Sequence, residues 1–233
     1  MNRATCIGDS DSSGSQRHTI ACMWGARKML KIEIAGSAIG GEDANEALWV
    51  DEIVSASDLA NVSLTFRLES QRNVDLDNLV RPAMRALKRS GFYQSGFPEL
   101  NSITASKLVG QPIGLTIESG SRLVPEGKLL SVESDRIPPS DPTFAWKSEW
   151  TAAIQKEWDA PVICNPIWLA ISTTSLRSLV DLMKPIINVL ERVLRRDPNG
   201  RNPFCPNDHL VDWLQIRRVS SGAALKLVAG MLS

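Results

Sequence analysis

The sequence predicts an α+β protein built from two tandem domains, each with the element order β-α-β-α-β-β. The first observation is an internal repeat: LVRPAMRAL (Leu79–Leu87) resembles LMKPIINVL (Leu182–Leu190). Both segments carry a base, then a proline, then apolar residues at helical spacing, and proline is tolerated in the first turn of a helix. The second observation is that the segments flanking both helices follow one another in the same order. Six elements in matching order indicate a duplication.

The first half shows alternating or short apolar runs that end in turn residues, which are typical of strands, and two runs with helical periodicity. In chain order we expect a strand (Lys31–Gly41), a helix (Glu46–Ala56), a second strand (Asn61–Ser70), the first main helix (Leu79–Leu87) and two final strands (Ser102–Val109 and Ile113–Ser119).

The second half repeats this pattern. The corresponding elements are Leu129–Pro139, Trp146–Trp158, Asn165–Thr174, Leu182–Leu190, His209–Val219 and Ala224–Gly230. Residues 1–29 are polar and small around GDSDSSGSQR, which is typical of a disordered leader. The predicted organisation is therefore a leader (1–29), a first domain (30–118), a linker rich in Gly, Ser and Pro (119–128) and a second domain (129–233).

Composition narrows the class of protein. The chain has 26 basic and 26 acidic side chains, so attraction to DNA must come from local clusters of basic residues. Its four cysteines contain no C-x-x-C pair, which argues against a disulfide framework or a zinc ribbon and favours a cytoplasmic location. No apolar run is long enough to span a bilayer, so no membrane partner is expected.

Two carboxylates, Asp75 and Asp77, stand two apart just before the first main helix. Like charges so close repel unless a cation or backbone N–H groups compensate them. In one interpretation Asp77 caps the helix and Asp75 pairs with Arg72 or Arg81. In the other the two carboxylates hold a metal ion, because Mg²⁺ prefers carboxylate oxygens and alternating extended residues face the same side.

The run DLDNLVRPAMRALKRSGFY resembles the signature of RusA-type Holliday junction resolvases, in which D-x-D-N-L-x-K opens a helix that ends in A-L-x-x-x-G-F/W. The resemblance extends over roughly Leu30–Glu118, and through the repeat a degraded copy covers roughly Leu129–Met231. It implies an α+β domain that dimerises and cleaves branched DNA with Mg²⁺ held by aspartates. We therefore expect two RusA-like domains packed as an intramolecular pseudo-dimer that acts in DNA recombination and repair; further self-association stays open.

The chain departs from the family pattern in both halves. In the first half Arg81 replaces the motif lysine, and Glu99 is the only acid where the family has a pair of aspartates. In the second half Ser178 and Val180 replace the first two aspartates. Lys184 keeps the basic position there, and Asp208 keeps an acid. The resemblance thus implies catalytic roles for Asp75, Asp77, Arg81, Glu99, Asp208 and Lys184, with Asp75, Asp77 and Asp208 as metal ligands.

Three alternatives stay open. The first half could keep one working metal site from Asp75, Asp77 and Glu99. The acids of both halves could meet in one composite site with Asp208. Finally, catalysis could be lost, which would leave a module that binds DNA or a partner protein.

Clusters of basic residues indicate contacts with DNA phosphates, which position a duplex without reading its sequence. The predicted DNA-binding residues are Arg72, Arg85, Lys88, Arg89, Lys107, Arg217 and Arg218. The alternative is a solvated helix face whose cations lie favourably near the helix C-terminus.

Overall fold

The structure is a computed structural model that describes residues 30–36, 59–70, 74–93, 100–110, 112–139, 142–197 and 204–232. Within these ranges, no helix is both long enough and apolar enough to cross a membrane. The predicted leader (1–29) and the expected helix at Glu46–Ala56 lie outside the described residues.

In the described part of the chain, eight strands form one mixed sheet in the order β1-β4-β2-β3-β7-β6-β8-β5. The strands are β1 (Lys31–Ala35), β2 (Asn61–Leu68), β3 (Ser102–Val109), β4 (Gly114–Ser119), β5 (Lys128–Ser134), β6 (Ile167–Thr173), β7 (Val211–Arg218) and β8 (Leu225–Met231). These strands fall on the segments predicted from alternation and turn residues. The protein is therefore α+β, as the sequence predicts.

The two halves of the sheet have the same strand order. From the outer edge to the centre, each half runs through its first, fourth, second and third strand. The second and third strands pair in parallel, as β2 with β3 and β6 with β7, and the other pairs within each half are antiparallel. A parallel pair needs a crossover, and here a helix supplies it in each half.

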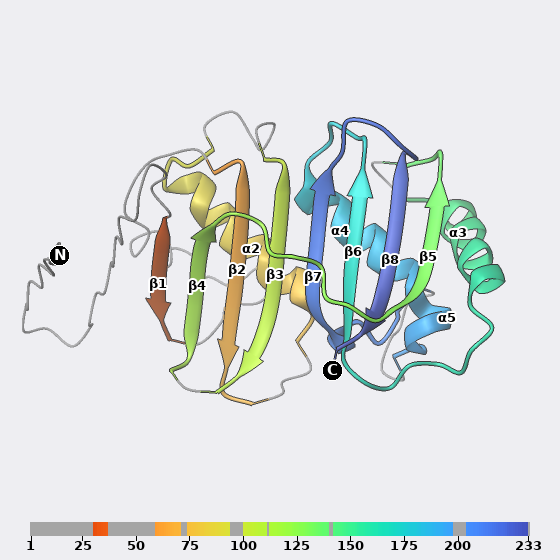
Figure 1. Cartoon of the computed structure of the whole chain (residues 1–233), viewed down its shortest axis with the longest axis horizontal. Coiled ribbons are helices and arrows are strands. Elements are labelled where there is room, and N and C mark those ends of the chain that lie inside the picture. The colour runs from red at the N-terminus through yellow and green to blue at the C-terminus, as the bar shows by residue number, and fades with distance from the viewer. Residues whose placement is uncertain are drawn as a thin grey trace, which may run out of the picture.

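The halves join where β3 pairs antiparallel with β7 at the centre of the sheet (Figure 1). Ala105 and Leu214 face each other there, and each is the fourth residue of its strand. A row of paired residues crosses all the strands at this level, and every member is buried. From edge to edge the row is Ile32, Ile117, Leu64, Ala105, Leu214, Leu169, Ala229 and Leu130.

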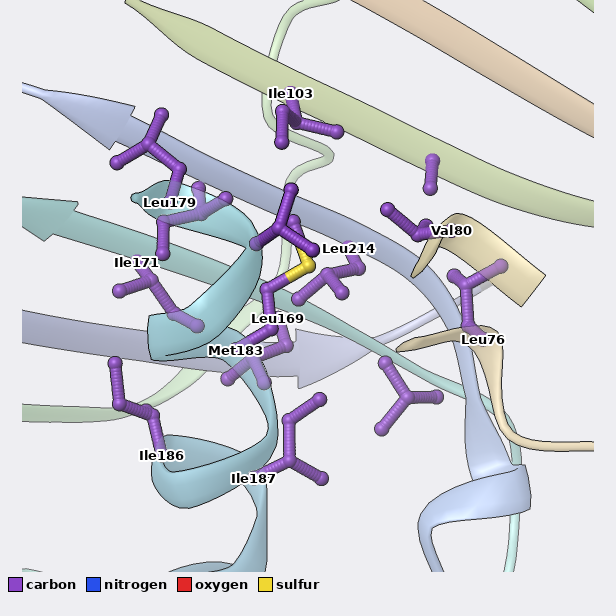
Figure 2. Packing of buried hydrophobic residues seen from close by; sticks show 14 of the residues in the cluster. Leu76, Val80, Ile103, Leu169, Ile171, Leu179, Met183, Ile186, Ile187 and Leu214 are labelled. Atoms are coloured by element: carbon purple, nitrogen blue, oxygen red, sulfur yellow. The ribbon is translucent and has the colours of Figure 1, made fainter. Parts of the chain in front are cut away.

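The helices are α2 (Leu76–Arg89), α3 (Phe144–Glu157), α4 (Leu179–Ile187) and the short α5 (Glu191–Leu194). Both α2 and α4 lie on the same face of the sheet, and α3 lies beside the β5 edge (Figure 1). Apolar side chains from both halves meet beneath them, with Leu76 and Val80 near Leu214 and Met183 (Figure 2). The hydrophobic core is therefore continuous across the β3–β7 junction.

Both main helices begin earlier than the position of their prolines predicts. Pro82 lies inside α2 and Pro185 inside α4, beyond the first turn in each case. The apolar stripe of α2 already starts at Leu76 and continues through Leu79, so packing against the sheet extends the helix toward its N-terminus.

The opposite face of the sheet is crossed by the segment that joins β4 to β5 (Figure 1). Arg122 in this segment donates from Nη2 to Thr65 Oγ1 at 2.7 Å, and its carbonyl accepts a 2.8 Å bond from Gln215. Gln215 also reaches Thr104 Oγ1 at 3.2 Å. These bonds satisfy polar groups buried on that face, which would otherwise destabilise the sheet.

Candidate metal centre

The first two aspartates lie at the start of α2. Asp75 is the N-cap residue and Asp77 lies in the first turn, while Leu76 between them is 1% exposed and points into the core. No side-chain cap is formed; instead Asp75 Oδ2 accepts a 2.8 Å hydrogen bond from the side chain of Asn78. The interpretation of Asp77 as the helix cap is therefore wrong, because the cap position belongs to Asp75, whose carboxylate bonds no backbone N–H group of the helix.

The third aspartate comes from the other half of the chain. Asp208 opens the 3-10 turn η2 (Asp208–Leu210) that leads into β7. One carboxylate oxygen from each of Asp75, Asp77 and Asp208 lies within 4.8 Å of the others, the separation expected of ligands to one shared cation. Among the described residues this is the only group of three or more such side chains that could hold a metal ion. The geometry matches the composite alternative.

The base in the cluster also comes from the second half. Lys184 Nζ lies 2.9 Å from Asp208 Oδ2 and 3.5 Å from Oδ2 of both Asp75 and Asp77. Arg81, the base that the family motif placed beside Asp75 and Asp77, is exposed on α2. No ion pair joins Arg81 to these acids in the part of the chain that the structure describes. The residue beside the aspartates is thus Lys184, reached across the junction between halves.

Burial makes the cluster electrostatically costly. Desolvation, followed by a hydrogen bond and repulsion from Asp208, raises the pKa of Asp75 to about 7, against the opposing effect of Lys184. Burial also raises the pKa of Asp77, although Lys184 opposes the change. Burial disfavours the charged form of Lys184, but the carboxylates of Asp77 and Asp208 outweigh it and raise its pKa. The site therefore favours added positive charge or retained protons.

The position of Asp77 sharpens this conclusion. Asp77 is 7% exposed, and its Oδ1 atom is buried without a hydrogen-bond partner among the described residues. An uncompensated buried carboxylate oxygen is rare because its desolvation is not repaid by any contact. A ligand that accepts this lone pair would remove the penalty, and a metal ion does so.

Charge counting selects the kind of cation. Carboxylate ligands of a metal are deprotonated, so a bound ion would displace any proton that Asp75 retains; the three carboxylates would then carry three negative charges against the one positive charge of Lys184. The deficit of two charges equals the charge of a divalent cation, and hard divalent cations such as Mg²⁺ take carboxylate oxygens. The donor set, the orphaned oxygen of Asp77 and the charge balance all fit Mg²⁺, which Asp75, Asp77 and Asp208 would hold.

A buried lysine ties together the segments that carry the acids. Lys107 on β3 is 6% exposed at its side chain, and its Nζ donates to the carbonyls of Val74 (3.1 Å) and His209 (2.6 Å). It also pairs with Asp212 at 2.9 Å. Val74 and His209 each adjoin one of the site aspartates, one in each half. Lys107 was predicted to contact DNA, but three protein oxygens occupy its ammonium in the interior.

The other predicted DNA-binding residues are dispersed. Arg72 and the predicted catalytic Glu99 lie outside the described residues. Lys88 and Arg89 are exposed at the end of α2, about 20 Å from its start, and Arg85 is half-buried on the same helix.

Arg217 and Arg218 lie at the far end of β7 from the acids, roughly 20 Å along the strand. Arg217 is exposed and bonds Ser172. The guanidinium of half-buried Arg218 bonds the carbonyls of Leu100, Ser175 and Arg177, so its donors are engaged within the protein, and its role at DNA stays a prediction.

Sequence reasoning missed two residues that shape the centre. Asn78 orients Asp75, and it stands in the quoted run D-L-D-N, where its amide could have been recognised as a donor to the neighbouring carboxylate. Asp212 accepts the ion pair from Lys107. The only sequence signal was an acid between apolar residues at the start of the strand.

Comparisons with known proteins add no assignment: no protein-family model and no curated protein sequence matches this chain. The chemistry of the centre must therefore be inferred from its own residues.

Proposed function

We propose that this chain is a RusA-like, Mg²⁺-dependent endonuclease that acts on branched or duplex DNA through one composite metal centre. The observation that carries the proposal is the meeting of Asp75 and Asp77 from the first half with Asp208 and Lys184 from the second. A largely buried cluster of three carboxylates and one lysine that keeps some exposure to solvent suits phosphodiester hydrolysis, in which both water and phosphate need positive charge nearby.

We also propose that the two halves form an intramolecular pseudo-dimer. The shared strand order and the central pairing of Ala105 with Leu214 support a two-fold relation between them. In this arrangement the family's third acid and its lysine reach the first two aspartates from the opposite half. The complementary losses in the two halves are then explained, because one centre needs only one set of acids.

The three aspartates would hold Mg²⁺, which when bound polarises a phosphate and lowers the pKa of a bound water. Asn78 keeps Asp75 Oδ2 in place through its 2.8 Å bond. The side chain of Lys184 is 37% exposed, so part of it is open to solvent, from which a phosphate would arrive. It compensates the acids without substrate and can pair with a phosphate oxygen when DNA is present.

The proposal is tested on a synthetic four-way junction with the full chain and Mg²⁺. We expect cleavage, and we expect Asp75→Asn combined with Asp77→Asn to abolish it while junction binding persists. Even outer-shell partners of metal ligands change metal affinity by about 10–100-fold, so loss of two ligands should exceed that. Asp181→Asn is the matched control, because Asp181 is an exposed acid in the first turn of α4. Cleavage retained in the double variant would overturn the site.

A second candidate function is a binding module without catalysis, which engages DNA or a partner protein. The ion pairs of Lys184 favour it, since an ammonium that already contacts three carboxylates can serve as a purely structural network. Titration of Mn²⁺ and Mg²⁺ by calorimetry separates the two. A metal-binding centre gives heat that disappears in Asp77→Asn, whereas a structural network gives none, and junction affinity without cleavage would then support the second candidate.

A further inference from the structure

Among the described residues, the metal centre has no counterpart at the start of α4. The N-cap residue of α2 is Asp75, and that of α4 is Ser178, whose hydroxyl accepts a hydrogen bond from the backbone N–H of Asp181. The next residue of each helix is a buried leucine, so the two helix starts correspond position by position. At the position of Asp75 the second half therefore carries a hydroxyl that is used as a helix cap.

The following position removes the other carboxylate. Asp77 corresponds to Val180, an apolar side chain that is 8% exposed and belongs to the hydrophobic core. Valine offers no ligand atom, and the hydroxyl of Ser178 is engaged with the helix. Two of the three metal ligands are thus missing, whatever residue stands at the position that corresponds to Asp208. A hard divalent cation has no site there, because it requires several oxygen ligands.

The base at the second location differs as well. The counterpart of Lys184 is Arg81, since each precedes the helix proline, and Arg81 is exposed on α2. The two-fold relation between halves therefore holds for the sheet and the helices but not for the chemistry. One side has three acids and a lysine, and the other an arginine, a serine and a valine.

We infer that each chain makes a single incision: it nicks one strand of a branched DNA and leaves the symmetry-related strand intact. This inference rests on the proposed function. A four-way junction has two-fold symmetry, so its resolution into two duplexes needs two cuts at equivalent phosphodiesters. A pseudo-dimer can present equivalent surfaces to both strands, yet in the part of the chain that the structure describes only one surface carries a set of ligands for the ion.

The reaction is one hydrolysis per bound chain. The oxygen of a water molecule forms a bond to phosphorus, the bond from phosphorus to one ester oxygen breaks, and a proton from the water ends on that leaving oxygen. The products are one hydroxyl end and one phosphate end in one strand. A nicked junction must then be consumed by a second incision, made by another chain or another nuclease, or be resealed by a ligation reaction.

A supercoiled plasmid with an inverted repeat that extrudes as a cruciform tests the inference. Supercoiling holds the cruciform open, so the first nick releases it and removes the branched substrate. Two cuts within one complex give linear DNA directly, whereas one cut gives a nicked circle. With plasmid in excess over the full chain and Mg²⁺ present, we expect nicked circles as the first and main product.

The dependence on protein concentration completes the test. Linear DNA that appears only at high ratios of chain to plasmid reports two chains making one cut each, which supports the inference. Linear DNA formed at the same rate as nicked circles, in a proportion independent of chain concentration, would overturn it while leaving the proposed endonuclease activity intact. No cleavage with either Mg²⁺ or Mn²⁺ would overturn the proposed function and this inference with it. The Asp75→Asn, Asp77→Asn double variant should produce neither nicked circles nor linear DNA.

Discussion

The start of α2 and the start of α4 have the same local geometry but opposite chemistry. In α4 the N-cap Ser178 satisfies a backbone N–H and Val180 fills the core, as a stable helix start requires. In α2 the side chain of the cap residue bonds no backbone N–H, and Asp77 is buried with an oxygen that has no partner among the described residues. The comparison indicates that α2 gives up stability to assemble a charged centre, while α4 keeps stability and has no centre. Replacing first-half residues by their second-half counterparts tests this difference.

The largest effect is expected at Lys107, the sixth residue of β3. The sixth residue of β7 is Ile216, which is fully buried. Lys107→Ile leaves Asp212 and two partly buried carbonyls without the ammonium, so we expect the free energy of unfolding to fall by about 2–4 kcal/mol. Thermal melting measures this loss, and Mn²⁺ calorimetry should show weaker binding because the two acid-bearing segments are no longer tied together.

A matched control and a rescue separate packing from the ion pair. Ile216→Val in the other half should cost about 1 kcal/mol and leave Mn²⁺ binding unchanged. Adding Asp212→Val to Lys107→Ile replaces the pair by apolar groups and should recover part of the stability but not the metal affinity. If Lys107→Ile alone keeps both stability and affinity, the buried lysine does not position the centre.

The next effect has the opposite sign. Asp77→Val introduces the side chain of the second half and removes a buried carboxylate oxygen that lacks a partner. We expect the metal-free protein to gain about 1–3 kcal/mol, the usual penalty for such a group, and to lose metal binding. Thermal melts in EDTA and in Mg²⁺ measure both. The control Asp181→Asn on α4 should change neither the stability nor the metal binding. A loss of stability in Asp77→Val would contradict the idea that the start of α2 is less stable because it carries the charged centre.

Much of this fold could be predicted from the sequence because its signals are local. The strands β3 and β7 follow alternation and turn residues, and the repeated base and proline marked α2 and α4. The partners of the centre could not be predicted in the same way. The approach of Lys184 to Asp75 depends on how the two halves pair across β3 and β7, and one-dimensional patterns carry no distance between them. The burial of Lys107 was missed for the same reason.

The pH dependence should also differ between the halves. The pKa of Asp75 is about 7 in the folded protein against an ordinary value of 3.8, so the folded state binds this proton more tightly than the unfolded state. The carboxyl group therefore contributes stability that is fully present below about pH 4 and is lost as the pH rises toward about 7. Asp75→Ser, the residue of the second half, should remove that loss.

Thermal melts in EDTA between pH 4.5 and pH 8 measure the difference between the wild-type chain and Asp75→Ser. A divalent ion competes with the proton, so Mn²⁺ affinity should rise with pH up to about 7 and then level off. If the melting temperatures of the two proteins change with pH in the same way across this range, Asp75 titrates with its ordinary pKa.

The smallest effect concerns the caps themselves. Ser178→Ala removes the side-chain cap of α4, whose hydroxyl accepts from Asp181 N at 3.4 Å, and should cost about 0.5–1 kcal/mol. Asp75→Ala at the equivalent position removes no cap, because that carboxylate bonds Asn78 instead of a backbone N–H. We expect its metal-free stability at pH 8 to be unchanged or higher, since it relieves repulsion from Asp208. Urea unfolding measures the free energy of unfolding of both variants. If Ser178→Ala and Asp75→Ala lose the same free energy, Asp75 stabilises its helix as an ordinary cap, and the two helix starts do not differ in the way their chemistry implies.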